Sequence, residues 1–200
     1  DKYNVSNICL ATSRDLYHWE KHGPALKIEE ARWDGGQIKA GAICPEEISG
    51  RYVMYITGEE TRWEPAIGIA YSDDLLHWQE WERNPVLLPR EGFFDSKGIE
   101  VGTVPVITEE GILLIYNGWD KDTLYKPGAV LFSEEDPSKV LWRSESPILM
   151  TSKDWGEELR GESHVNHIVA EGLVKHNNDW WLYYGAADKA ICLAKCKVRE

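Results

Sequence analysis

The 200-residue sequence is 42% apolar and 28% charged and contains 10 tryptophans, which is ample material for a buried core and atypical of a disordered chain. Its net charge of −12 argues against nucleic acid and anionic membranes as partners, because both require clustered lysines and arginines. No apolar run approaches the roughly 18 residues of a membrane span, and the first residues do not resemble a signal peptide. We therefore expect a cytoplasmic protein without a membrane partner.

Four cysteines, Cys9, Cys44, Cys192 and Cys196, show no paired metal-binding spacing. Cys9 and Cys192 occupy equivalent positions in similar apolar segments. The pattern predicts small core residues in a reducing compartment and no metal site.

A repeated strand pattern dominates the chain. An aromatic strand ending in glycine occurs at residues 51–58, 112–118 and 180–185, and its glycines, Gly58, Gly118 and Gly185, are 60 and 67 residues apart. A following apolar strand occurs four times, at residues 8–13, 67–72, 129–133 and 191–194. A period of this length with four short strands per unit favours an all-β propeller.

The phase of the repeat predicts an incomplete ring. The chain opens on the third strand of one unit and stops after the third strand of another, which gives about three and a half blades. We predict one propeller domain over 1–200, with a partial blade at 1–38, blades at 39–90 and 91–150, and a partial blade at 151–200. Propellers close with about four to eight blades, so we expect a truncated chain, or a second chain that completes the ring.

Two similar turns precede outer strands, at residues 13–19 and 72–78. Each contains Asp, His and Trp, which suggests chemistry, but repetition on an outer hairpin favours a structural role. We expect the Ser and Asp side chains to bind turn backbone groups and the Trp to pack between neighbouring sheets.

Polar residues on the innermost strands are the candidates for chemistry, at residues 39–47, 97–105 and 162–169. Glu100 lies between Gly98 and Gly102, whose small size would leave room for a ligand beside a catalytic carboxylate. Alternatively, Glu100 pairs with Lys97 or binds backbone groups. His164 and His167 are three residues apart, and on a strand they would face opposite sides, which disfavours a shared metal.

A series of segments resembles glycoside hydrolase family 130: residues 94–102, 111–118, 128–132 with Asp136-Pro137, and 183–188. The resemblance runs over essentially all 200 residues. It implies a five-bladed β-propeller that acts as a β-mannoside phosphorylase or a β-mannosidase. In this family a Glu-Asp-Pro-Arg motif and the Asp general acid belong to a first blade, which would precede Asp1.

The resemblance also implies roles for individual residues. Lys97 matches a phosphate-binding lysine, Asp188 matches an aspartate that binds sugar hydroxyls but could equally be a turn residue, and Tyr125 lies near a phosphate-binding tyrosine. Glu100 is the candidate catalytic base. The candidate substrate-binding residues are Lys39, Glu46, Lys97, Asn117, Tyr125, Glu162, His164, Asn166 and Asp188.

The family's phosphorylases have His at the position of Asn117, and two arginines expected in a phosphate site are absent near Lys39 and Thr57. We therefore predict inverting hydrolysis of β-mannosidic or related linkages. The alternatives are a phosphorylase that uses inorganic phosphate as co-substrate and releases mannose 1-phosphate, and a non-catalytic carbohydrate-binding propeller. We expect no cofactor, an oligosaccharide substrate, and a homo-oligomer as one possible assembly. Trp33, Trp63, Trp119 and Trp155 could stack on sugars, although structural packing is favoured for each.

Overall fold

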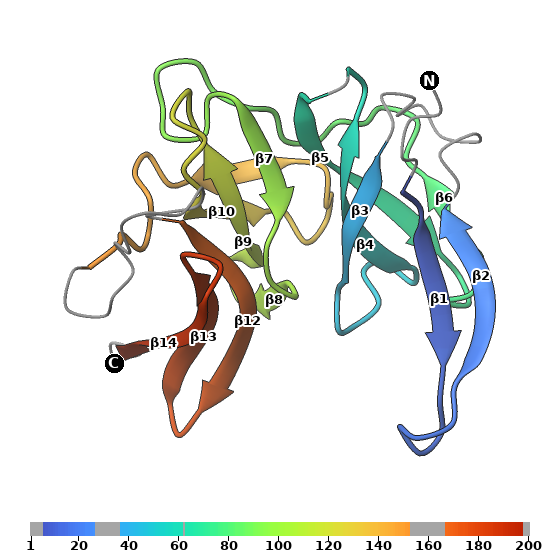
Figure 1. The fold of residues 1–200 in the computed structure, drawn as a ribbon. Coiled ribbons are helices and arrows are strands. Elements are labelled where there is room, and N and C mark those ends of the chain that lie inside the picture. Colours follow the sequence, from blue (N-terminus) through green and yellow to red (C-terminus); the bar gives the residue numbers. More distant parts are fainter. Residues whose placement is uncertain (1–5, 27–36, 62, 153–166, 198–200) are drawn as a thin grey trace.

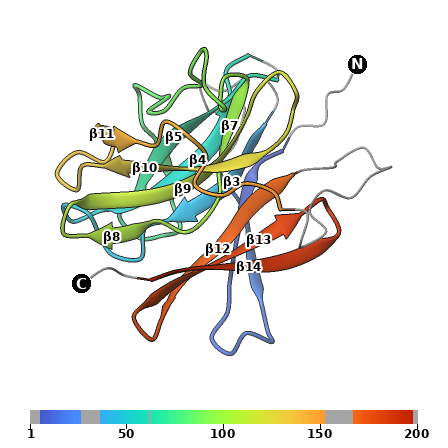
Figure 2. The ribbon, with the colours of Figure 1, turned by 90° about the vertical axis from the view of Figure 1, so that its left-hand side faces the viewer.

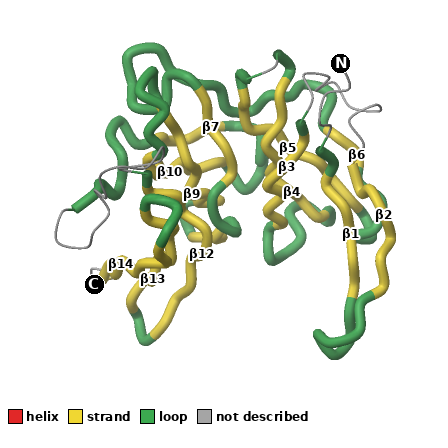
Figure 3. Tube along the Cα trace, in the orientation of Figure 1, coloured by secondary structure: helices red, strands yellow, loops and turns green. Residues whose placement is uncertain are grey.

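The computed structural model describes residues 6–26, 37–61, 63–152 and 167–197. Within these ranges the chain forms strands β1 to β14 joined by loops (Figure 3). None of the described residues lies in a helix suited to crossing a membrane. The candidate residues Glu162, His164 and Asn166, together with Trp33 and Trp155, lie outside the described residues.

Four antiparallel sheets follow one another in chain order across the molecule (Figures 1 and 2). The first pairs β1 (Ile8–Thr12) with β2 (Glu20–Leu26). The second has the order β3 (Ile38–Ile43), β4 (Tyr52–Glu59), β5 (Pro65–Ser72), β6 (Gln79–Glu80).

The third sheet has the order β11 (Val140–Arg143), β10 (Lys126–Phe132), β9 (Gly111–Trp119), β7 (Gly98–Val101), and β8 (Val106–Thr108) also pairs with β9. The fourth has the order β12 (Ile168–His176), β13 (Asp179–Ala186), β14 (Ala190–Lys197). Consecutive sheets pack face to face, which confirms an all-β fold of propeller type.

The main core lies between the second and third sheets. Tyr55 and Phe132 are both fully buried, with ring centroids 4.8 Å apart, and the Tyr55 hydroxyl donates to the Pro137 carbonyl at 3.0 Å. On the other face of β4, Met54 and Ile56 belong to a cluster with Leu26 and Ile38. Side chains therefore alternate along β4 between two interfaces, as the period of a strand requires.

Polar side chains also join neighbouring sheets. The Thr57 hydroxyl accepts a hydrogen bond from the Val101 backbone N–H at 2.9 Å. Asn117 is the equivalent of Thr57 in the third sheet and bonds to the fourth sheet. Its side-chain amide accepts a hydrogen bond from the Ala170 N–H at 2.7 Å and donates one to the Ala170 carbonyl at 3.2 Å. Both side chains are 1% exposed, so they satisfy backbone groups that β-bulges or strand ends leave unpaired.

The register of the fourth sheet differs from the predicted repeat. Opposite Ile38, Ile99 and Ile168 of the inner strands lie Gly58, Gly118 and Ala186. The third equivalent residue is therefore Ala186 and not Gly185. A shift of one residue exchanges the two faces of a strand, so the side chains of β13 are compared with those of β4 and β9 from Ala186 and not from Gly185.

The outer turns are structural, as predicted. Asp15 Oδ1 accepts from the N–H groups of Tyr17 and His18, at 2.9 and 2.8 Å, and the second turn repeats this arrangement around Asp74. The hydrogen bond from the His18 side chain is the largest cause that lowers the pKa of Asp15 to about 2. Trp78 packs against the cluster between the first two sheets.

Two parts of the structural predictions are wrong. Cys44 is buried as expected, but Cys9 and Cys196 are exposed, so these two cysteines are not core residues. Trp19, the equivalent of Trp78, is 55% exposed and is not packed between sheets.

Candidate functional site

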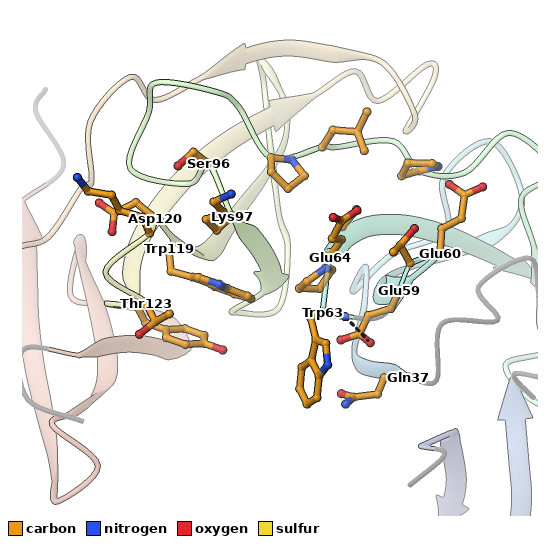
Figure 4. Close-up of a pocket in the computed structure, with 18 of the residues that line it drawn as sticks. Gln37, Glu59, Glu60, Trp63, Glu64, Ser96, Lys97, Trp119, Asp120 and Thr123 are labelled. Atoms are coloured by element: carbon orange, nitrogen blue, oxygen red, sulfur yellow. Dashed lines mark hydrogen bonds between the residues drawn. The ribbon is translucent and has the colours of Figure 1, made fainter. Parts of the chain in front are cut away.

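A cavity of about 900 Å³ lies between the second and third sheets, where the β4–β5 and β9–β10 loops face each other (Figure 4). This volume is near the upper end of the range for small-molecule sites, about 300–1,000 Å³. The predicted residues Lys39, Lys97 and Tyr125 line it, and so do Trp63 and Trp119.

The two walls of the cavity differ in charge. Glu59, Glu60 and Glu64 lie on the wall formed by the second sheet. Lys97 and Lys121 lie on the wall formed by the third sheet, where Asp120 is already paired with Lys126 at 3.1 Å. The second-sheet wall thus carries three carboxylates together with Lys39, and the third-sheet wall carries two lysines together with the paired Asp120.

Glu100 forms an ion pair with Lys39, with 3.1 Å between Oε2 and Nζ. The two residues occupy equivalent positions in the repeat, since Lys39 lies opposite Thr57 and Glu100 lies opposite Asn117. The Glu100 side chain is 15% exposed and the Lys39 side chain 39%. Glu100 therefore has a cationic partner, but this partner comes from the neighbouring sheet and is not Lys97.

The expectation that Gly98 and Gly102 leave space beside Glu100 is wrong. A Cβ at Gly98 would overlap the Trp119 indole, and one at Gly102 would lie 2.7 Å from the Ile115 carbonyl oxygen. Glycine is required at both positions by close packing. The space for a ligand is instead the cavity that Lys39 and Lys97 line.

Irregularities interrupt the innermost strands close to these residues. The pairing of β3 with β4 shifts between Lys39 and Ala42, and β12 has a bulge at Glu171. Bulges redirect side chains and are frequent near active sites. Burial raises the pKa of Glu171, and the negative charge of Glu100 adds to the shift, so the bulge brings a second carboxyl within electrostatic reach of Glu100.

An aromatic column borders the cavity. The Tyr125 ring stacks on Trp119 on one side and on His167 on the other, with centroid distances of 4.4 and 5.2 Å. Burial raises the pKa of Tyr125 to about 12, with further contributions from Glu100, Asp188 and Glu59. Tyr125 thus presents a neutral hydroxyl that can donate a hydrogen bond near neutral pH.

The structure does not bring every predicted residue to this cavity. Glu46 is exposed beyond the end of β3 opposite to Lys39, and Asn117 is occupied in the bridge to Ala170. Asp188 lies in the three-residue loop that joins β13 to β14, in which Ala187 and Asp188 have φ values of 51° and 55°. Its carboxylate contributes to the surroundings of Tyr125 without lining the cavity.

Sequence reasoning missed Glu59 and Glu171. Glu59 is 4% exposed, lines the cavity, and accepts a hydrogen bond from the Trp63 N–H at 3.3 Å. In the sequence it is followed by Glu60 and Thr61 and resembles an ordinary polar turn. Its position in the repeat could have identified it, because Glu59 directly follows Gly58 as Trp119 directly follows Gly118.

Comparisons with known proteins agree with this architecture. The chain is 35% identical over 194 residues to the 1,2-beta-oligomannan phosphorylase of Thermoanaerobacter sp. (strain X514), covering 96% of this chain and 59% of the relative. The structure of beta-1,2-mannobiose phosphorylase from Listeria innocua in complex with beta-1,2-mannobiose matches with a TM-score of 0.81 and 29% identity, covering 94% of this chain and 50% of that one.

A third match comes from work reporting that the GH130 family of mannoside phosphorylases contains glycoside hydrolases that target beta-1,2 mannosidic linkages in Candida mannan. This structure has a TM-score of 0.79 and 31% identity, and the match covers 96% of this chain and 58% of that one. The chain thus spans between half and three fifths of the length of these three relatives.

The family model described as beta-1,4-mannooligosaccharide phosphorylase matches residues 1–200. With the ordered strand repeat, the packing of the sheets and these relatives, this match shows that the chain belongs to glycoside hydrolase family 130.

Proposed function

We propose that the protein is a β-mannoside phosphorylase, which cleaves a β-mannosidic linkage with inorganic phosphate and releases mannose 1-phosphate. The observation that carries the proposal is that Lys97 and Lys121 lie on one wall of the cavity, the lysine wall, and Glu59, Glu60 and Glu64 on the other, the carboxylate wall. The names of relatives support β-1,2-linked mannosides as the first substrates to test.

The lysine wall suits a phosphate dianion. Lys97 and Lys121 supply two ammonium groups, and Tyr125 supplies a neutral hydroxyl in the same cavity. Charge-assisted hydrogen bonds are about twice as strong as neutral ones, and several are needed to desolvate a dianion. Lys121 was not among the residues predicted from the sequence, and its place on this wall strengthens the phosphorylase alternative.

On the carboxylate wall, Glu60 and Glu64 suit the hydroxyls of a neutral sugar. In phosphorolysis an oxygen of hydrogen phosphate bonds to C1 of the mannosyl unit and the bond from C1 to the glycosidic oxygen breaks. In the net reaction the leaving oxygen gains the proton that hydrogen phosphate loses. Phosphate is itself the nucleophile, so no general base is required. Glu100, held by Lys39, would then accept a hydrogen bond from a sugar hydroxyl.

The test measures consumption of β-1,2-mannobiose by the full-length protein over a range of phosphate concentrations. The proposal requires a rate that saturates with phosphate and falls to background without it. A rate independent of phosphate would overturn it.

Hydrolysis is the second candidate, because Glu100 is mostly buried with a cationic partner and one matched structure comes from work on family hydrolases. A hydrolase would need Glu100 to activate water, and general-base catalysis contributes about 10²–10⁴-fold. We expect Glu100→Gln to lower phosphorolysis about tenfold or less. If the activity does not need phosphate and Glu100→Gln lowers its rate at least about 10²-fold, the protein is a hydrolase.

A further inference from the structure

Trp63 is an exposed aromatic side chain on the wall of the cavity. It lies in the loop between β4 and β5 and is 67% exposed despite its size. Its backbone has φ of 70°, a left-handed conformation that bulky residues rarely adopt. Such strain persists only where the surroundings hold it and is concentrated at functional sites.

A buried carboxylate holds this conformation. Glu59 Oε2 accepts a hydrogen bond from the Trp63 N–H at 3.3 Å, and the Glu64 N–H donates to the Thr61 carbonyl at 3.0 Å. Glu59 is 4% exposed at the end of β4, so the acceptor is fixed by the sheet. The loop therefore presents Trp63 in a defined place, opposite the wall that carries Trp119 (Figure 4).

The two tryptophans serve different purposes. Trp119 packs against Gly98 and stacks on Tyr125, so it is part of the framework of the cavity. Trp63 is the more exposed of the two, and its neighbours on the wall include Gln37, Glu60 and Glu64.

An exposed indole beside an amide and two carboxylates favours a neutral sugar as the ligand. Amide and carboxylate oxygens accept hydrogen bonds from hydroxyls, whereas the carboxylates would repel phosphate. One face of a β-mannosyl ring carries axial C–H bonds and is apolar enough to pack on an indole.

We propose that Trp63 is a platform for a mannosyl unit beyond the disaccharide that the cavity cleaves, with Glu59 as the residue that positions it. This inference rests on the proposed function and adds that the protein prefers oligosaccharides of three or more units. The cavity volume of about 900 Å³ is at the upper end of the small-molecule range, in agreement with a ligand longer than a disaccharide.

The experiment compares kcat/KM for β-mannotriose and β-mannobiose in the full-length protein with saturating phosphate. We expect Trp63→Ala to lower the trisaccharide-to-disaccharide ratio about tenfold, the usual order for one lost aromatic contact, while disaccharide turnover changes less than about twofold. Trp63→Phe keeps a ring and should retain most of the ratio. Trp142→Ala is the matched control, because Trp142 is 53% exposed on β11 outside the cavity.

The same ratio tests the positioning role of Glu59. Glu59→Ala should lower the ratio as Trp63→Ala does, and Glu59→Gln, which keeps an acceptor oxygen, should restore it. An unchanged ratio in Trp63→Ala, or an equal loss on both sugars, would overturn the inference.

Failure of the proposed function gives a different result. In that case the wild-type protein turns over neither sugar with phosphate. Equilibrium binding of the two sugars then decides the role of Trp63. If the wild-type protein binds the trisaccharide more tightly than the disaccharide and Trp63→Ala abolishes this difference, the role is supported. Equal binding of the two sugars by the wild-type protein would overturn it.

Discussion

Lys97 is the first residue that we propose for phosphate binding. Its backbone N–H donates to the Trp119 carbonyl at 2.9 Å, which fixes the residue at the wall of the cavity. Because hydrogen bonds to charged groups contribute about 1.5–3 kcal/mol, we expect Lys97→Met to raise the KM for phosphate about 10- to 100-fold. The KM for mannobiose should change much less, as steady-state kinetics with each substrate varied would show.

Lys139→Met is the control for this prediction, since Lys139 lies before β11 and does not line the cavity. An unchanged KM for phosphate in Lys97→Met would remove Lys97 from the phosphate site.

Glu171 gives a prediction about pH. Burial raises its pKa above 4.5, with Glu100 as the second cause, so the folded state favours the protonated form. The stability that this group contributes is complete below about pH 4.5, its ordinary value, and is lost as the pH rises through the raised value. Glu171→Gln should therefore raise the Tm at pH 7, and the gain should vanish below about pH 4.5.

Thermal unfolding at pH 4 and pH 7 measures this difference. Glu109→Gln, in the turn between β8 and β9, should show no comparable dependence. A gain in Tm of the same size at both pH values would mean that the carboxyl of Glu171 is not the cause.

At the scale of elements, side chains that bridge sheets are expected to hold the propeller together. Thr57→Val keeps the shape of the side chain but leaves the buried Val101 N–H without the acceptor that it now has at 2.9 Å. An unsatisfied buried donor costs about 1–3 kcal/mol, and urea unfolding should show a loss of this size. Thr57→Ser keeps the hydroxyl and should lose much less, so equal losses in the two variants would refute the bridging role.

Strands were easier to predict than their register. The apolar and aromatic residues identify β4, β9 and β13 from the sequence alone, because β4 and β9 bury both of their faces and β13 buries one. The equivalence of Ala186 with Gly58 and Gly118 was not predictable, because Gly185 suggests a more obvious alignment. The correct alignment becomes visible only when the partners on β12 are known.

At the scale of the whole molecule, the repeat period predicted the fold and the inner strands predicted part of the site. Lys39, Lys97 and Tyr125 reach the cavity because the repeat places their strand ends together. The pairing of Glu100 with Lys39 depends on how two sheets pack and on an irregularity in β3, and neither leaves a pattern in the sequence. Glu59 was not predicted because its burial results from tertiary packing.

The measurement that tests the central claim most directly is a ³¹P NMR time course of the full-length protein with β-1,2-mannobiose and phosphate, with free mannose assayed in parallel. Phosphorolysis predicts that each disaccharide consumed removes one phosphate and yields one mannose 1-phosphate and one mannose. Two molecules of free mannose per disaccharide, with the phosphate signal unchanged, would contradict the account and identify a hydrolase.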